Sequence, residues 1–204
     1  MTTMRLHWSP KSPFVRKVMI CAHELGVAQH LELVRSVAAM RAPNPDLMLD
    51  NPLSKIPTLV LADGSVLYDS LVICEYLNHL AQGPLFPASG VRRWQALRWQ
   101  ALGNGLLDAL ILWRNERERE QPDRVLLEAF EAKLWACLAA LEREVPDLRR
   151  SALCIGQIAL GCAFGYLDYR FSAIDWRARA PALAAWNHEI GLRPSFAATE
   201  ARDG

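Results

Sequence analysis

The first part of the chain alternates short strand-like runs with helical stripes. Residues 4–8 (MRLHW) place apolar and polar side chains in alternation, a period of two that predicts a strand. An apolar stripe at helical spacing follows and ends at Gly26, a common stop signal; its members are Val15, Val18, Met19, Ala22 and Leu25. Residues 30–34 (HLELV) alternate again and predict a second strand.

The next stretch predicts a hairpin and another helix. Residues 38–49 contain two prolines and predict only a weak helix. Residues 58–68 (TLVLADGSVLY) predict two strands joined at Asp63-Gly64, because glycine tolerates the positive φ of a tight turn. From Ser70 onward, apolar residues recur at helical intervals and predict a helix that ends near Gly83. The predicted order is strand, helix, strand, weak helix, strand, strand, helix.

Beyond residue 90 the pattern is almost entirely helical. We expect one buried helix face to consist of Trp94, Leu97, Ala101, Gly105, Ala109 and Leu112, followed by a solvated charged stretch at 114–120 (RNERERE). A second apolar face consists of Leu126, Phe130, Leu134, Cys137, Leu138 and Leu141. Residues 155–171 are apolar nearly all round, which predicts a central buried helix, and Pro181 begins a last helix.

This change of pattern predicts an α/β domain followed by an all-α domain. The Gly- and Pro-rich stretch AQGPLFPASG, residues 81–90, favours a linker there. We therefore expect a first domain at 1–82, a linker at 83–90 and an all-helical domain at 91–204.

Composition narrows the function classes. The 204 residues carry 23 basic and 22 acidic side chains, a net charge of +1, whereas a dedicated nucleic-acid-binding protein shows a basic excess. The N-terminus lacks the apolar core of a signal peptide, and no stretch is long and apolar enough to span a bilayer. We expect a cytoplasmic protein with no nucleic-acid or membrane partner.

Cysteine and histidine usage argues against disulfides and metals. The five cysteines are an odd number without CxxC spacing, and most have apolar neighbours, so we interpret them as small core residues in a reducing compartment. The five histidines are scattered and have no cluster of cysteines or carboxylates beside them. We therefore expect no metal site.

Three short motifs carry the candidate chemistry. Ser12 precedes Pro13 at a helix start, where a plain N-cap and a hydroxyl that stabilises a bound thiolate use the same geometry. Ile56-Pro57 stands directly before a strand; a cis-proline there would expose the backbone of Ile56 to an extended peptide, and a trans-proline would merely begin the strand. Asp69-Ser70 begins a helix, with Ser70 expected as its cap, and suits an amine and a carboxylate.

Together, in this order, these motifs resemble the soluble glutathione transferases. SPKSPFVRKV, NPLSKIPTL and LYDSLVICEYL are similar to the thioredoxin-like N-terminal domain of that family. IALGCAFGYLDYRF, DWRARAPALAAW and RPSFAAT resemble the helical C-terminal domain of bacterial members. The resemblance covers nearly the whole chain. It implies a bacterial serine-type member with a thioredoxin-like domain and an all-helical domain.

The resemblance also implies residue roles for glutathione, which serves as co-substrate with no further cofactor. Ile56, before a cis-Pro57, would pair with the cysteinyl backbone, and Asp69 and Ser70 would hold the γ-glutamyl end. Ser12 would stabilise the thiolate, with Ser9 as the runner-up. Lys55 or Arg41 would meet the glycine carboxylate, and the sequence does not choose between them.

The sequence departs from the family pattern at three places. Asp69 stands where Glu is frequent, and Ser54 stands where Gly is common, which predicts an altered turn. The central helix usually starts with a Ser or Thr followed three residues later by Asp; Cys154 and Gln157 stand there instead. Because a thiol is a poor acceptor, we expect a weaker helix start.

The expected function is a cytosolic homodimeric detoxification enzyme that conjugates reduced glutathione to a small hydrophobic electrophile held between the domains. The alternative is a non-enzymatic member of the same fold that binds a ligand or a protein. Ser12 favours the enzyme, because a pure interaction module has no need of a hydroxyl there.

Overall fold

The computed structural model describes residues 2–203, which form two compact units. The first unit takes in residues 2–86 and 198–203, and the second is Pro87–Ala197. The division lies inside the stretch expected to be a linker. The last residues differ from the expected division, which placed all of 91–204 in the helical domain. They belong to the first unit: Ala198, Thr199, Glu200 and Arg202 line a cavity with the first helix, and Asp203 forms an ion pair with Lys11 at 3.3 Å.

The first unit is built on a four-stranded sheet with the order β2-β1-β3-β4. Its strands are β1 (Met4–Trp8), β2 (Leu31–Arg35), β3 (Thr58–Val60) and β4 (Val66–Leu67). β1 is parallel to β2 and antiparallel to β3, and β3 is antiparallel to β4. Gly64 has a φ of 84° in the β3–β4 turn, as the Asp-Gly pair predicts.

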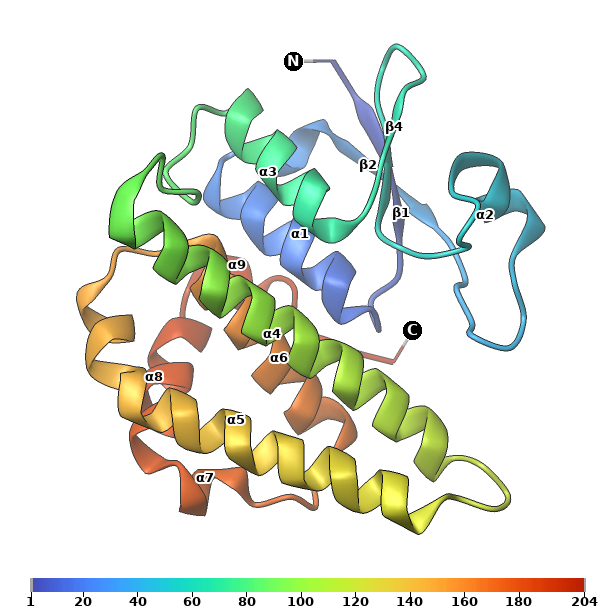
Figure 1. Ribbon diagram of the computed structural model, residues 1–204. Coiled ribbons are helices and arrows are strands. Elements are labelled where there is room, and N and C mark those ends of the chain that lie inside the picture. Colours follow the sequence, from blue (N-terminus) through green and yellow to red (C-terminus); the bar gives the residue numbers. More distant parts are fainter. Residues whose placement is uncertain (1, 204) are drawn as a thin grey trace. The chain divides into compact units, whose positions relative to one another are not determined.

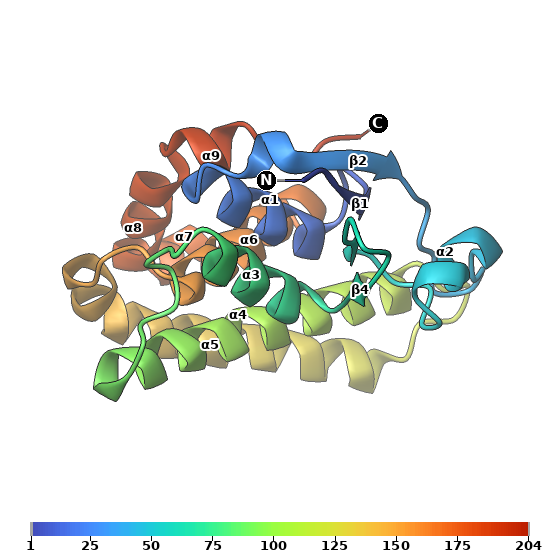
Figure 2. The same cartoon turned by 90° about the horizontal axis from the view of Figure 1, so that it is seen from above.

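Three helices cover the two faces of this sheet. α1 (Pro13–Glu24) and α3 (Ser70–Leu80) lie side by side on one face, and α2 (Pro45–Asp50) lies on the other (Figures 1 and 2). A short 3₁₀ helix, Ala28–His30, leads into β2. The alternation of β1 follows this arrangement: Leu6 is fully buried toward α1 and α3, and His7 turns to the opposite face.

The second unit contains only helices. They are α4 (Gly90–Arg117), α5 (Arg124–Arg150), α6 (Ile155–Arg170), α7 (Trp176–Arg179), α8 (Pro181–Gly191) and α9 (Pro194–Ala197). α6 is buried along most of its length, as its all-round apolar pattern predicts. The observed order, a βαβαββα unit and then helices, confirms the predicted fold class.

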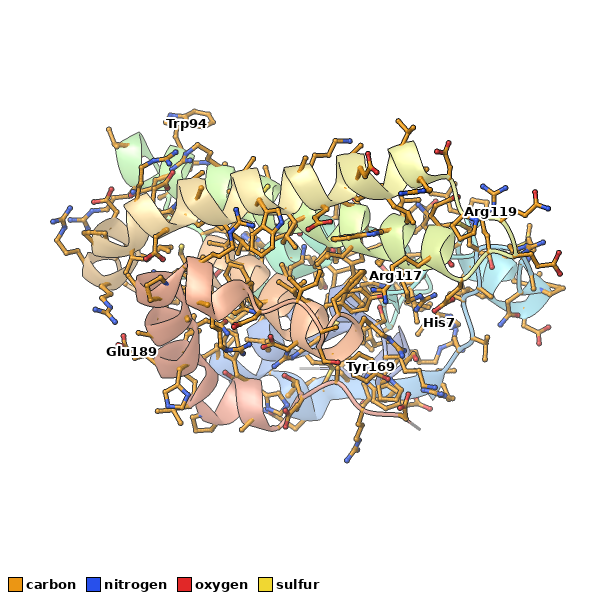
Figure 3. The ribbon with its side chains drawn as sticks, turned by 90° about the horizontal axis from the view of Figure 1, so that it is seen from below. His7, Trp94, Arg117, Arg119, Tyr169 and Glu189 are labelled. Carbon is orange, nitrogen blue, oxygen red and sulfur yellow. The ribbon has the colours of Figure 1, made fainter. Side chains whose placement is uncertain are left out.

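The buried face of α4 is the opposite of the predicted one. α4 packs closely on α6 because Gly103 and Gly156 leave no room for a side chain: a Cβ on Gly103 would lie 2.7 Å from the carbonyl carbon of Ala159. Trp94, on the predicted face, is 69% exposed, and its ring projects away from the helix (Figure 3). The buried face of α4 is therefore the one on which small residues allow close contact with α6.

The charged stretch at 114–120, which begins in the last turn of α4, is also more ordered than expected. Glu116 is buried, accepts hydrogen bonds from the backbone N–H of Asp123 at 2.8 Å and from Arg119 at 2.9 Å, and so shapes the turn into α5. These hydrogen bonds, the one from Asp123 foremost, hold the pKa of Glu116 below its ordinary value. One carboxylate in this stretch is therefore part of the turn rather than of a solvated face.

The start of α6 lacks a side-chain cap, in line with the sequence. Cys154 occupies the N-cap with extended backbone and makes no capping hydrogen bond. Gln157 does not reach back to it; its amide donates instead to the carbonyl oxygens of Leu148, Ser151 and Ala152. The glutamine holds the preceding loop in place of completing a capping box.

Two absences bear on function. Among residues 2–203, none of the helices combines the length and the apolar character needed to cross a bilayer. Over the same residues, no group of three or more His, Cys, Asp or Glu side chains could hold a metal ion.

Candidate active site

Ser12 lies at the N-cap of α1, as the Ser-Pro pair predicts. Its Oγ accepts a hydrogen bond from the backbone N–H of Val15 at 3.3 Å, and its own N–H donates to the carbonyl oxygen of Ser9 at 3.2 Å. The cap uses the oxygen as an acceptor, so the hydroxyl hydrogen remains able to point toward a bound group. That group would also lie at the positive end of the helix dipole.

Ser9, the alternative hydroxyl, has a different set of partners. Its Oγ accepts from the backbone N–H of Lys11 at 3.4 Å and from the guanidinium of Arg35 at 3.2 Å. Arg35 comes from the end of β2 and also lies over the Trp8 ring at 5.8 Å. Ser9 therefore lies beside the guanidinium of Arg35, whereas Ser12 lies at a helix N-terminus.

The Ile56-Pro57 peptide bond is cis, as predicted. Among residues 2–203, neither the N–H nor the C=O of Ile56 has a hydrogen-bond partner. Pro57 is buried and leads directly into β3. The segment thus presents one donor and one acceptor in strand-like backbone, the pair that an extended peptide requires.

Asn51 holds this segment in shape, and the sequence reading missed it. The side chain is 1% exposed, and its Nδ2 donates to the carbonyl oxygen of Lys55 at 3.1 Å and to Thr58 Oγ1 at 2.9 Å. Its Oδ1 accepts from the N–H of Leu53 at 3.0 Å. One amide therefore ties both ends of the turn that carries Ile56. A lone Asn before a proline is too common a turn signal to reveal this role.

Ser54 adopts a backbone conformation that suits glycine. Its φ is 50°, in the left-handed region that favours glycine. Its Oγ accepts from the backbone N–H of Asn44 at 2.8 Å, next to the start of α2. Ser54 thus adopts a backbone conformation that is less favourable for serine than for glycine, and its side chain forms a hydrogen bond at the start of α2.

The cap of α3 is Asp69, and the expectation that Ser70 caps it was wrong. Asp69 Oδ1 accepts from the N–H of Leu71 at 2.9 Å, while Ser70 is the first helical residue and is 1% exposed. Among the described residues, the N–H groups of Ser70 and Val72 have no hydrogen-bond partner. An exposed carboxylate therefore stands beside two free N–H donors, an arrangement suited to the amine and carboxylate of one α-amino acid group.

The two basic candidates for the glycine carboxylate are both exposed. Lys55 lies in the turn just before Ile56, and Arg41 lies in the loop that precedes α2. The fold of the first unit does not choose between them.

His7 is a further buried polar residue that the sequence reading did not single out. Its Nδ1 lies 2.7 Å from Ser36 Oγ, and its Nε2 lies 2.8 Å from Asp50 Oδ2. Ser36 follows β2, and Asp50 is the last residue of α2. The imidazole therefore joins β1 to the end of α2, directly before Asn51, as a satisfied core histidine.

Two buried cysteines lie between α1 and α3. Cys21 and Cys74 are both fully buried, as is Lys17. Burial acts to raise the pKa of the Cys74 thiol, but a hydrogen bond with Cys21 and the charge of Lys17 prevail, and the pKa lies below its ordinary value. Because solvent does not reach these thiols, they do not compete with Ser12 for a substrate.

A cavity of about 450 Å³ adjoins both serines. It runs along one stripe of α1 from Ser12 to His23, with Leu33 of β2 and the tail 198–202 completing its wall. All of these residues belong to the first unit. The candidate hydroxyls therefore face a space large enough for a small organic molecule.

Comparisons with known proteins agree with this reading. The family pattern "Glutathione S-transferase, N-terminal domain" matches residues 11–80. The GST-like protein YibF of Escherichia coli (strain K12) is 32% identical over 203 residues, which cover 97% of this chain and 98% of that protein.

Solved structures are also similar. A glutathione transferase family member from Pseudomonas fluorescens Pf-5 with bound glutathione is 41% identical, with a TM-score of 0.93 and coverage of 98% of this chain and 100% of that one. A structure from the same organism with bound S-(propanoic acid)-glutathione is 40% identical, with a TM-score of 0.90 and the same coverage. By sequence identity over almost its entire length, this chain belongs to the glutathione S-transferase family.

Proposed function

We propose that this protein is a glutathione transferase of the serine type, which binds reduced glutathione, keeps its thiol ionised and conjugates it to a small electrophile. The observation that carries the proposal is the position of Ser12: its hydroxyl oxygen caps α1, so its hydrogen is able to donate to a bound sulfur. The family relationship and the glutathione-bound relative support the same ligand.

The proposed binding mode uses backbone and charged groups of the first unit. The cysteinyl backbone of glutathione pairs with the N–H and C=O of Ile56, before the cis-Pro57. Asp69 accepts from the γ-glutamyl amine, and the free N–H donors at Ser70 and Val72 hold its carboxylate. Lys55 or Arg41 meets the glycine carboxylate.

The proposed chemistry follows from thiol ionisation. A free thiol has a pKa of about 8.5, so only a small fraction is thiolate at neutral pH. A hydrogen bond from Ser12 and the N-terminus of α1 both stabilise the charged form and lower that pKa. The thiolate sulfur then forms a bond to an electrophilic carbon, and a leaving group departs with its electron pair or a double bond takes up a proton.

The setting we propose is a cytoplasmic homodimer with a role in detoxification. All five cysteines are free, and four are buried, which suits a reducing compartment. Exposed apolar side chains on α4, such as Trp94 and Leu112, support an interface between copies. Sedimentation in solution tests the assembly.

The direct test combines retention on immobilised glutathione with turnover of a general aryl halide. We expect the wild type to show both. In Ser12→Ala, turnover at saturating glutathione should fall more than the affinity for glutathione does. Retention without turnover would favour the alternative, a binding protein of the same fold. A crystal soaked with glutathione would show whether Ile56 and Asp69 take the contacts assigned to them.

A further inference from the structure

The cavity beside Ser12 has an apolar wall. Val15 and Met19 face it from α1, Leu33 from β2, and Trp8 from the end of β1. Val15 is almost fully buried, whereas Leu33 keeps 43% of its surface exposed, so the cavity has an apolar floor and one open apolar side. Such a wall suits the ring or hydrocarbon part of a small molecule.

The charged groups on the same wall are predominantly basic. Arg16 of α1 and Arg202 of the tail line the cavity, and Glu200 is the one acidic residue among its lining residues in the described part of the chain. A third guanidinium, Arg35, reaches the Ser9 hydroxyl at the cavity's rim. The nearby Asp203 forms an ion pair with Lys11.

From this wall we propose that the second substrate is an apolar electrophile that carries a carboxylate, with its apolar part on Val15 and Met19 and its acid group toward Arg202 and Arg16. This inference rests on the proposed function and adds the substrate class. In an aromatic displacement, the thiolate sulfur bonds to the ring carbon, and chloride leaves with the bonding electrons.

Basic side chains beside the thiolate would favour the approach of a negatively charged substrate. A carboxylate that approaches a thiolate is repelled, and at the short separations of an active site two like charges interact strongly even in a partly aqueous setting. Guanidinium groups on the cavity wall offset that repulsion and bind the acid in addition. The same charges also stabilise the thiolate itself, so the benefit to an acidic substrate has to be measured against a neutral acceptor.

The test compares two acceptors of the same size. para-Chloro-meta-nitrobenzoate carries the acid, and para-chloro-meta-nitrobenzamide is its neutral counterpart. The readout is the ratio of their kcat/KM values, each divided by its uncatalysed rate constant. We expect the wild type to favour the benzoate by about tenfold, the effect of one well-placed charge interaction.

Two variants should shift this ratio in opposite directions, and a third serves as the control. Arg202→Gln should lower the preference for the benzoate roughly three- to tenfold, and Glu200→Gln should raise it by a similar factor, because each changes one charge on the cavity wall. Arg5→Gln is the matched control. Arg5 is exposed on β1 and projects to the sheet face opposite Trp8, so its loss should leave the ratio unchanged.

A wild-type ratio of one or less would overturn the proposal, as would equal ratios in Arg202→Gln and Arg5→Gln. If neither acceptor is turned over, the transferase function fails, and the acid preference is still measured separately. Calorimetry with para-methyl-meta-nitrobenzoate and its amide, which have no leaving group, then reads binding alone. Tighter binding of the benzoate that weakens in Arg202→Gln supports the acid site; equal binding of the two rejects it.

Discussion

The hydroxyl oxygen of Ser12 accepts a hydrogen bond from the backbone N–H of Val15 at 3.3 Å. This contact gives Ser12 two roles at once. The oxygen satisfies a helix N–H that would otherwise lack a partner, and the hydrogen is left for a ligand. Replacing the residue therefore changes both the stability of α1 and the electrostatics of whatever binds at its N-terminus, and an experiment must separate the two effects.

The first prediction concerns Asp69. Asp69→Ala should weaken glutathione binding by about 1.5–3 kcal/mol, the range for a hydrogen bond to a charged group. Asp69→Asn is the matched variant: it keeps an oxygen for the N–H of Leu71 but lacks the charge. Calorimetry should show weaker glutathione binding in both variants. Only Asp69→Ala should also lose stability of α3. Unchanged affinity in both would remove the γ-glutamyl assignment.

The second prediction concerns the contact of α4 with α6. A Cβ on Gly103 would lie 2.7 Å from the carbonyl carbon of Ala159, whereas a Cβ on Gly105 meets nothing within 4 Å. Gly103→Ala should destabilise the protein by about 1–3 kcal/mol, because backbone must move. Gly105→Ala should stabilise it by about 0.5–1 kcal/mol through helix propensity. Denaturant melts that rank the two variants the other way would refute the packing described for α4.

The third prediction concerns the start of α6. Burial raises the pKa of the Cys154 thiol, against the opposing effect of the N–H groups of Gln157 and Gly156. A hydroxyl of similar size would accept from those donors, so Cys154→Ser should stabilise the protein by roughly 0.5–2 kcal/mol. Cys154→Ala offers no acceptor and should not stabilise the protein. If the serine variant melts no later than wild type, core packing of the sulfur outweighs the cap.

The fourth prediction concerns pH. Glu144 accepts from Arg98 Nη2 at 2.5 Å and from Trp99 Nε1 at 2.6 Å, and these bonds, with Arg98 foremost, hold its pKa below the ordinary value. As the pH falls, Glu144 is therefore protonated in the unfolded chain before it is protonated in the folded protein. The stabilisation from the Glu144 carboxylate is fully present above the ordinary Glu pKa of about 4.3, and it is lost as the pH falls through the lower pKa of the folded protein.

Glu144→Gln tests this linkage. Because Arg98 is 55% exposed, we expect a loss of only about 0.5–1 kcal/mol at neutral pH. The difference in unfolding free energy between wild type and variant should shrink as the pH is lowered through the acid range. A difference that stays constant with pH would show that the carboxylate contributes by packing alone.

Much of the first unit could be predicted from the sequence because local signals agree there. The alternation in residues 4–8, the Asp63-Gly64 turn and the Ser12-Pro13 helix start each follow from backbone preference, and each appears in the structure. Asp69 and Ser70 show the limit of such signals. Both are favoured N-caps, so sequence alone does not tell which residue takes the position.

Features that depend on distant packing could not be predicted. α4 carries apolar residues on two faces, and only the approach permitted by Gly103 determines which face meets α6. Asn51 and His7 act through partners several residues or whole elements away, such as Thr58 and Asp50. Likewise, the tail that lines the cavity carries no periodic pattern that would place it beside α1.

Ser9 must be separated from Ser12 before a catalytic role is assigned. Ser9→Ala removes the hydroxyl that Arg35 contacts and leaves the α1 cap intact. We expect it to change the ionisation of bound glutathione less than Ser12→Ala does. A larger effect in Ser9→Ala would move the thiolate-stabilising role to Ser9. Ser12→Cys adds a positive control, because a thiol at this helix N-terminus should form a mixed disulfide with oxidised glutathione, visible by mass spectrometry.

The most direct measurement is a pH titration of thiolate absorbance for glutathione bound to the wild type and to Ser12→Ala. If Ser12 donates to the sulfur, its loss should raise the thiol pKa by about one to two pH units, the equivalent of one hydrogen bond to a charge, while affinity stays nearly unchanged. Identical titration curves for the two proteins would show that Ser12 only caps α1, and would contradict the account of this protein as a serine-type glutathione transferase.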